Sequence, residues 1–144
     1  MEALAENTEQ ETAVILPLPG QPWPAQGGIY AGSYVKDGQL HHGIFAAGVD
    51  SDVQTSFDTL DGKVKDLPQI AGFSDWRAPD QREVMLSFIA NPDDFNRKGY
   101  DSIYLTSTPF GSYFAWVLGF EGGNVVVYAR SSEFRFRPFR SFVA

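Results

Sequence analysis

The chain has 144 residues, 43% of them hydrophobic, which supports one domain with a hydrophobic core and leaves little room for two. It contains no cysteine, which excludes disulfides, thiolate metal sites and cysteine nucleophiles. No apolar run approaches the roughly 18 residues that span a bilayer, so we expect a soluble protein with no membrane partner.

The net charge of −7 is unevenly distributed along the chain. Residues 1–60 contain one lysine against eight acidic residues, and the sequence pI is about 4.6. An acidic chain is repelled by phosphate backbones, which argues against a nucleic-acid partner.

Residues 1–12 are acidic and lack both a positive start and an apolar segment. We therefore expect a disordered acidic tail rather than a signal peptide, followed by a single domain over residues 13–144. The prolines around Trp23 indicate an extended path, which we interpret as a rigid connector; a partner-binding motif is the alternative.

An N-terminal hairpin is predicted over residues 28–47. Asp37-Gly38 lies between two strand-like runs, and such a pair is a strong signal for a tight hairpin turn. His41 and His42 are the only histidines, and neighbours in a strand face opposite sides, so they cannot bind one metal together. We expect one of them to be partly buried and the other to lie on a polar face.

Helical structure is expected over residues 61–67 and, as one main amphipathic helix, over about residues 80–91. Asp80 can cap the second helix, with Glu83 completing a capping box. The spacing places four apolar side chains on one face: Val84, Met85, Phe88 and Ile89.

The C-terminal part predicts an antiparallel meander, because four runs rich in aromatic and β-branched residues are separated by turn formers. The expected strands are residues 102–108, 113–120, 124–130 and 133–140. With the helix and the N-terminal hairpin, this predicts an α+β domain.

Four arginines interleave with phenylalanines near the end of the chain: Arg130, Arg135, Arg137 and Arg140. Alternation in a strand sends successive side chains to opposite faces, which favours buried phenylalanines and a solvated cationic face. The alternative is that one or two of the arginines pair with carboxylates from elsewhere in the chain, and the rest offer a ligand surface.

Short blocks resemble a known family: residues 72–83 (GFSDWRAPDQRE), 104–108 (YLTST), 115–123 (AWVLGFEGG) and 134–140 (FRFRPFR). Together they are similar to a prophage and bacterial domain family related to the C-terminal domain of the Legionella collagen-like protein. Residues 19–32 also look like the N-terminal part of phage-borne members. One departure is Leu105, where the family usually has tryptophan.

The resemblance implies a C-type lectin-like fold, shared with retroelement-diversified phage tail tip proteins and with formylglycine-generating enzymes. It implies that Trp76 and Trp116 are core anchors and that Arg77 is a partly buried cation paired with a carboxylate. Arg137 or Arg140 would be the equivalent late in the sheet, with Asp75 and Glu83 as the carboxylate partners.

Enzyme activity is not expected, because the formylglycine-generating relatives depend on cysteines that this chain lacks. No triad order, phosphate-binding glycine loop or metal-ligand spacing appears in the sequence. Asp93, Asp94 and Asp101 are weak calcium-ligand candidates, and we predict no metal and no cofactor.

The first hypothesis is a tail-associated binding module of phage or prophage origin, located on the virion. It would recognise a protein or glycan on the host surface or another virion protein. The expected ligand-binding residues are Phe110, Tyr113, Tyr128, Arg130, Glu133 and Arg135, since exposed aromatics and arginines dominate recognition.

Two alternatives stay open. One is a small acidic phage protein that inhibits an intracellular complex in the host cytoplasm. The other is a structural tail subunit, which a homo-oligomer would favour.

Overall fold

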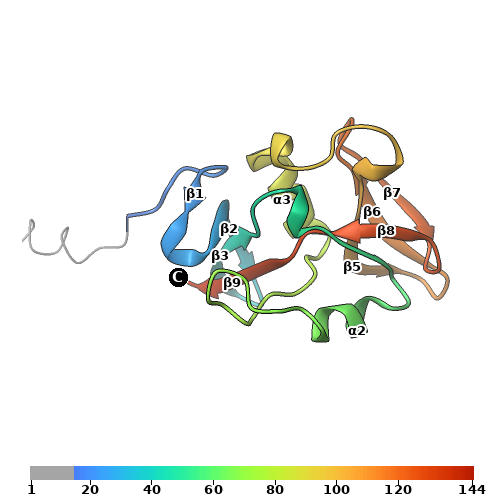
Figure 1. Cartoon of the computed structure of the whole chain (residues 1–144), viewed down its shortest axis with the longest axis horizontal. Helices are drawn as coiled ribbons and strands as arrows, with labels where there is room; N and C mark the ends of the chain where they lie inside the picture. Colours follow the sequence, from blue (N-terminus) through green and yellow to red (C-terminus); the bar gives the residue numbers. More distant parts are fainter. Residues whose placement is uncertain (1–14) are drawn as a thin grey trace, which may run out of the picture.

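A computed structural model describes residues 15–144, so the predicted acidic tail lies outside the described residues. The described part is an α+β fold with two helices and nine strands in two sheets (Figure 1), which confirms the predicted class. The sheets lie toward opposite ends of the long axis, with α3 between them.

The first sheet is antiparallel and curls into a half-barrel. The Asp37-Gly38 turn joins its two longest strands, and both turn residues have positive φ (53° and 76°), as a tight primed turn requires. The predicted hairpin is therefore confirmed. In spatial order the strands are β1 (Pro22–Trp23), β2 (Gly28–Lys36), β3 (Gln39–Phe45) and β9 (Phe139–Val143).

The second sheet contains the predicted meander, but only three strands of it. Consecutive antiparallel pairs join β5 to β6 and β6 to β7. In spatial order the strands are β4 (Val53–Ser56), β8 (Glu133–Phe136), β5 (Ile103–Phe110), β6 (Phe114–Gly119) and β7 (Asn124–Ala129).

The prediction of a single fourth strand over residues 133–140 is wrong. The strand ends at Phe136, and after Arg137 and Pro138 the chain enters the other sheet as β9. Proline has no N–H to donate to a ladder, which favours a break here, and the Pro138 carbonyl accepts from the Ala46 N–H at 2.9 Å. β8 pairs with β4 and, in parallel, with β5, rather than following β7.

The main helix, α3 (Gln81–Ala90), begins at a capping box formed by Asp80 and Glu83, as predicted. Its buried face differs from the prediction. Val84 is buried, but Ile89 is 68% exposed, and Glu83 and Ser87 are buried in its place. The apolar spacing could not predict a buried Glu83, because its burial depends on an ion pair with Arg77.

Shorter elements complete the connections. The predicted helical segment near residues 61–67 is α2 (Leu60–Lys65), next to β4. Four 3₁₀ turns are η1 (Pro24–Gln26), η2 (Val49–Ser51), η3 (Pro92–Asp94) and η4 (Gly99–Ser102). In residues 15–144, no helix is long and apolar enough to cross a membrane.

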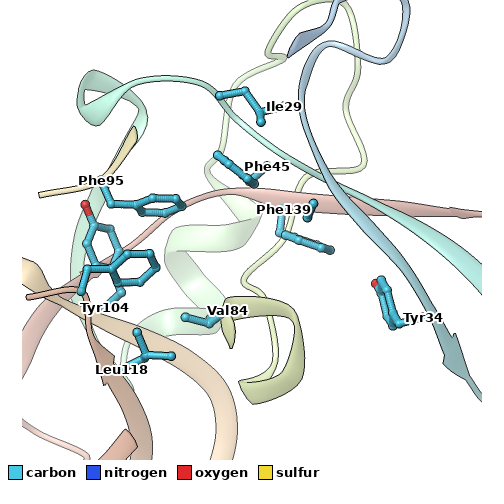
Figure 2. Close-up of a cluster of buried hydrophobic side chains, with 10 residues drawn as sticks. Ile29, Tyr34, Phe45, Val84, Phe95, Tyr104, Leu118 and Phe139 are labelled. Atoms are coloured by element: carbon cyan, nitrogen blue, oxygen red, sulfur yellow. The ribbon is translucent and has the colours of Figure 1, made fainter. Parts of the chain in front are cut away.

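The largest apolar cluster joins both sheets to α3 (Figure 2). Tyr34 and Phe45 come from the first sheet, Tyr104 and Leu118 from the second, and Val84 from α3. Because these residues share one cluster, the two sheets are packed as parts of a single core. Two smaller clusters lie around Phe134 and Phe136, and around Trp23 and Trp76.

The close approach of β2 to β3 gives a stability prediction. A Cβ added at Gly28 would lie 2.3 Å from the Phe45 carbonyl oxygen, so Gly28→Ala forces backbone movement. We expect a loss of about 1–3 kcal/mol in the free energy of unfolding, measured by urea denaturation.

The matched control is Gly62→Ala in α2, where an added Cβ meets nothing within 4 Å. Alanine is favoured over glycine in a helix by about 1 kcal/mol, so this variant should be slightly more stable. Equal effects of the two substitutions would contradict the observed packing.

Candidate functional site

The three late arginines are buried, and the interpretation of a solvated cationic face is wrong. Arg135, Arg137 and Arg140 are 7%, 2% and 6% exposed, and each contacts a carboxylate. Carboxylates were expected as an alternative to hold one or two of the arginines; they hold three. A buried guanidinium is tolerated because its charge is paired and its N–H groups are hydrogen-bonded.

Arg137 lies at the crossing between the two sheets and has the most complete set of partners. Its Nε donates to Asp52 at 2.7 Å and its Nη1 to Asp94 at 2.5 Å. Further donations go to the backbone carbonyls of Ala46 (3.0 Å) and Asp94 (2.9 Å). The guanidinium carbon is 4.2 Å from the centre of the Phe95 ring.

Asp52 also accepts a hydrogen bond of 2.6 Å from the Tyr104 hydroxyl. Burial raises the pKa of Tyr104, and the hydrogen bond to Asp52 raises it further, so the hydroxyl stays protonated and donates. The polar groups of this cluster form their hydrogen bonds with one another and with backbone carbonyls, which is typical of a structural ion network.

Arg140, in β9 of the first sheet, makes a second network. Its Nε donates to Asp75 at 2.7 Å, and its Nη1 donates to the carbonyl and side-chain oxygens of Gln26, both at 3.1 Å. The guanidinium carbon lies 3.8 Å from the Phe73 ring centre and 5.9 Å from that of Trp76. Trp76 is 4% exposed and belongs to the cluster around Trp23.

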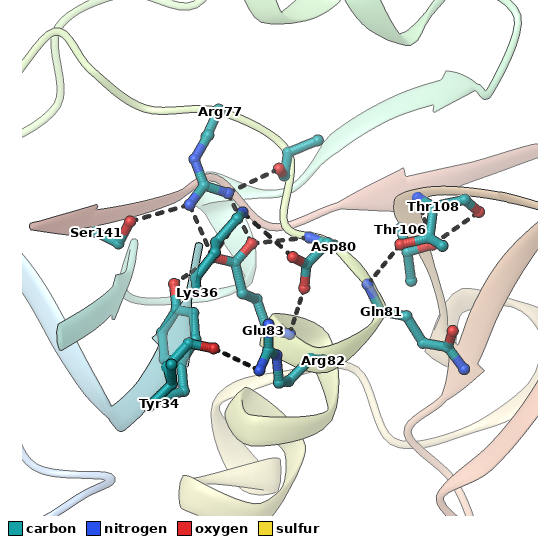
Figure 3. A network of polar contacts seen from close by, with 12 residues as sticks. Tyr34, Lys36, Arg77, Asp80, Gln81, Arg82, Glu83, Thr106, Thr108 and Ser141 are labelled. Carbon is teal, nitrogen blue, oxygen red and sulfur yellow. Dashed lines mark hydrogen bonds and ion pairs between the residues drawn. The ribbon is translucent and has the colours of Figure 1, made fainter. Parts of the chain in front are cut away.

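The third network surrounds Glu83 at the start of α3 (Figure 3). Arg77 donates to both carboxylate oxygens at 2.7 Å, and Tyr34 donates its hydroxyl to the same carboxylate. The Lys36 ammonium lies 3.7 Å from Glu83 and 3.3 Å from Asp80. Asp75 and Glu83, the two expected carboxylate partners, thus pair with Arg140 and Arg77 respectively.

The environment of Glu83 shifts its titration. Burial opposes the charged form, but the hydrogen bonds and positive charge of Arg77 prevail and lower the pKa of Glu83 to about 2. The carboxylate is therefore ionised over the whole physiological range and acts as an anchor for the cations around it.

A hollow of about 260 Å³ lies beside this network, with Lys36, Arg77, Asp61 and Ser107 in its wall. Both cations are already paired with Glu83 or Asp80, so the hollow has little free charge to offer a ligand. Within residues 15–144, no group of three His, Asp or Glu side chains is arranged to hold a metal ion.

Three predicted ligand residues lie together where β5 ends, β6 begins and β7 ends. Phe110 ends β5, Tyr113 lies in the turn to β6, and Arg130 follows β7. Phe114, which was not among the predicted ligand residues, pairs with Phe110 across β5 and β6. We call Phe110, Tyr113, Phe114 and Arg130 the aromatic tip; the strands that carry it, β5, β6 and β7, lie away from the C-terminus along the long axis of the molecule (Figure 1).

The aromatic tip is exposed but held by local contacts. Phe110, Tyr113 and Phe114 are 48%, 78% and 43% exposed. The Arg130 N–H donates to the Tyr113 carbonyl at 2.9 Å, and its Nη2 donates to the Gly111 carbonyl at 2.5 Å. An open hollow of about 310 Å³ runs between the two turns, with Tyr113, Phe114, Arg130 and Asp58 in its wall.

The other predicted ligand residues lie elsewhere. Arg135 is buried and pairs with Asp101 at 3.0 Å, so it is not part of an exposed surface. Tyr128 packs edge-on against Phe134, and Glu133 is exposed at the start of β8. Trp116, expected as a core anchor, is only partly buried and packs edge-on against Phe110 at 5.2 Å.

The two histidines differ in burial as expected, but both lie deeper than predicted. His42 is buried and hydrogen-bonds through Nδ1 to the Tyr30 hydroxyl at 2.8 Å, whereas His41 is only partly buried and stacks on Tyr34.

The chain matches no protein-family model, and a search of curated proteins gives no significant match. Its function is therefore inferred from the geometry described above and from the resemblance carried by the short blocks.

The lowered pKa of Glu83 predicts acid-sensitive stability. Because the folded-state pKa is about 2 and the ordinary value is 4.5, ionised Glu83 stabilises the fold fully above pH 4.5. This contribution, roughly 3 kcal/mol, should be lost as the pH falls from 4.5 toward 2. Urea denaturation should show that Glu83→Gln lowers the free energy of unfolding by a similar amount at neutral pH. Between pH 4.5 and 2, the free energy of unfolding of this variant should depend less on pH than that of the unsubstituted chain.

Glu133→Gln is the matched control, because Glu133 is exposed and makes no ion pair within the part of the chain that the structure describes. We expect it to change stability by no more than about 0.5 kcal/mol. If Glu83→Gln behaved like this control, Glu83 would not be the anchor of the network.

Proposed function

We propose that the chain is a non-enzymatic binding module and that the aromatic tip is its recognition surface. The observation that carries the proposal is the grouping of three exposed aromatic rings and an arginine at one end of the five-stranded sheet. Aromatic and arginine side chains provide a large share of binding energy at protein interfaces. Exposed large aromatics in one group are typical of interaction sites.

The contacts of Arg130 support this role. Its guanidinium carbon lies 4.9 Å from the Phe57 ring centre, and the Arg130 carbonyl accepts from the Asp58 N–H at 3.1 Å. The two turns and the segment before α2 are therefore tied together. A surface ordered before binding loses less conformational entropy when the partner arrives.

The other charged groups support a binding rather than a catalytic role. In the largest ion networks, around Arg137, Arg140 and Glu83, the charged groups are paired with other groups of the same chain. They hold the elements together and contribute no free nucleophile or base to the aromatic tip.

The proposal includes a phage or prophage origin and a C-type lectin-like fold, both supported by the resemblance of residues 72–140. The partner is a protein or glycan on the host surface, or another virion protein. Aromatic rings suit either class, because they stack on sugar faces as well as on protein side chains. On this proposal the protein acts on the virion tail.

A direct binding test uses fluorescently labelled full-length protein, intact cells of the bacterial host and purified virions. We expect saturable binding to one of the two. Tyr113→Ala with Arg130→Ala should weaken it by about tenfold or more, because the pair of truncations removes an exposed ring and the partly buried guanidinium beside it. Leu40→Ala is the matched control, since Leu40 is 46% exposed but lies in the other sheet.

Circular dichroism of each variant checks that the fold is retained. Absence of binding to both cells and virions, or equal binding by the double variant and the control, would contradict the proposal. A pull-down from host lysate tests the acidic-inhibitor alternative: recovery of a basic intracellular enzyme instead of virion proteins would favour that function.

A further inference from the structure

A hollow of about 330 Å³ lies beside the end of β9 in the first sheet, on the side of the molecule away from β6 and β7 (Figure 1). Its wall consists of one imidazole and four apolar residues: His42, Leu16, Phe142, Val143 and Ala144. No lysine, arginine, aspartate or glutamate side chain belongs to this wall. The volume lies at the lower end of the range for small-molecule pockets, so the hollow suits a small uncharged ligand.

The imidazole of His42 is held in one orientation by its neighbours. The residue is 7% exposed, and its Nδ1 lies 2.8 Å from the Tyr30 hydroxyl. The ring centres of Trp23 and Phe142 lie 6.4 Å and 5.4 Å from that of the imidazole. Within residues 15–144, the other ring nitrogen, Nε2, has no hydrogen-bond partner and is not enclosed by protein. Since Nδ1 faces Tyr30 in the interior, Nε2 faces the hollow.

The contact with Tyr30 makes Nε2 a donor. Burial raises the pKa of Tyr30, although a hydrogen bond from Ser33 opposes this, so the hydroxyl keeps its proton. Because the Tyr30 oxygen accepts from Ser33, its own proton is available for Nδ1 of His42. The neutral imidazole then carries its proton on Nε2, and a protonated imidazole carries one there as well. The hollow therefore combines apolar walls with an unused N–H donor.

We propose that this hollow binds a small neutral acyl compound, whose carbonyl oxygen accepts from Nε2 of His42 and whose apolar chain lies against Leu16, Phe142 and Val143. A polar group in apolar surroundings is costly unless it is hydrogen-bonded, so an acceptor opposite Nε2 is favourable. A carbonyl supplies this acceptor without a charge. A carboxylate would also accept, but the wall has no lysine or arginine to compensate its charge.

This site goes beyond the proposed recognition surface and does not depend on it. The hollow at the aromatic tip and the hollow beside His42 share no residue. Binding at one site therefore leaves the other accessible, and each is tested separately.

The test is a titration of the full-length protein with hexanamide, followed by nuclear magnetic resonance. We expect saturable shifts of the backbone amides of His42 and Phe142 and of the His42 Nε2 resonance, without a shift at Tyr113. The dissociation constant should be about 1 mM. Hexylammonium has the same chain length but no acceptor, and it should bind at least about tenfold more weakly. No saturation by hexanamide up to about 20 mM, or equal affinity for the two probes, would overturn the proposal.

A substitution in the wall tests the location of the site. Val143→Trp fills the hollow, and because Val143 is 49% exposed the larger side chain leaves the core intact. We expect it to weaken hexanamide binding by at least about tenfold. Val49→Trp is the matched control, since Val49 is 46% exposed in η2 and lies outside the hollow, and it should bind as the unsubstituted chain does. Equal affinity of the two variants would contradict the proposal, whatever the result of the cell-binding test.

Discussion

The paired guanidinium of Arg137 is the interaction on which the rest of this structure depends. It lies where the chain leaves the second sheet at β8 and enters the first at β9. Its side chain is 2% exposed and contacts Asp52, Asp94, Ala46 and Phe95, which come from the segments before β4, after α3 and after β3. Burying a charge is costly unless it is paired and hydrogen-bonded, so these segments are held to one arrangement.

The same solution recurs at Arg77 and Arg140, which attach α3 and the segment around residues 73–76 to the first sheet. Since the chain has no cysteine, disulfides cannot provide these connections, and ion pairs with stacked aromatic rings take that place. The ion pairs and the proposed recognition surface therefore use different residues. The arginines of the interior hold the scaffold, and the proposed recognition surface uses the exposed aromatic residues at the end of the second sheet instead.

Local signals predicted what depends on neighbours in sequence. Asp37-Gly38 predicted the hairpin, and Asp80 with Glu83 predicted the start of α3, because turn and cap geometry involve only a few consecutive residues. The break at Pro138 had a local signal, the missing proline N–H, that the prediction of one strand over residues 133–140 did not use. The parallel pairing of β8 with β5 was missed because strand pairing is decided by distant segments. For the same reason alternation alone could not show that Arg135 would be buried and paired with Asp101, or that Phe114 would join Phe110 and Tyr113 at the tip.

Native-state hydrogen exchange of Arg137→Met tests the central claim most directly. Because the Asp52 side chain would stay buried and that of Asp94 partly buried without their cation, we predict a loss of about 3–5 kcal/mol in the free energy of unfolding. The amides of β3 and β9 should lose protection together with those of β5 and β8. Arg82→Met, which removes an exposed guanidinium bonded to the Val35 carbonyl, should cost about 1 kcal/mol or less. A similarly small loss for Arg137→Met, or a loss confined to one sheet, would contradict the account.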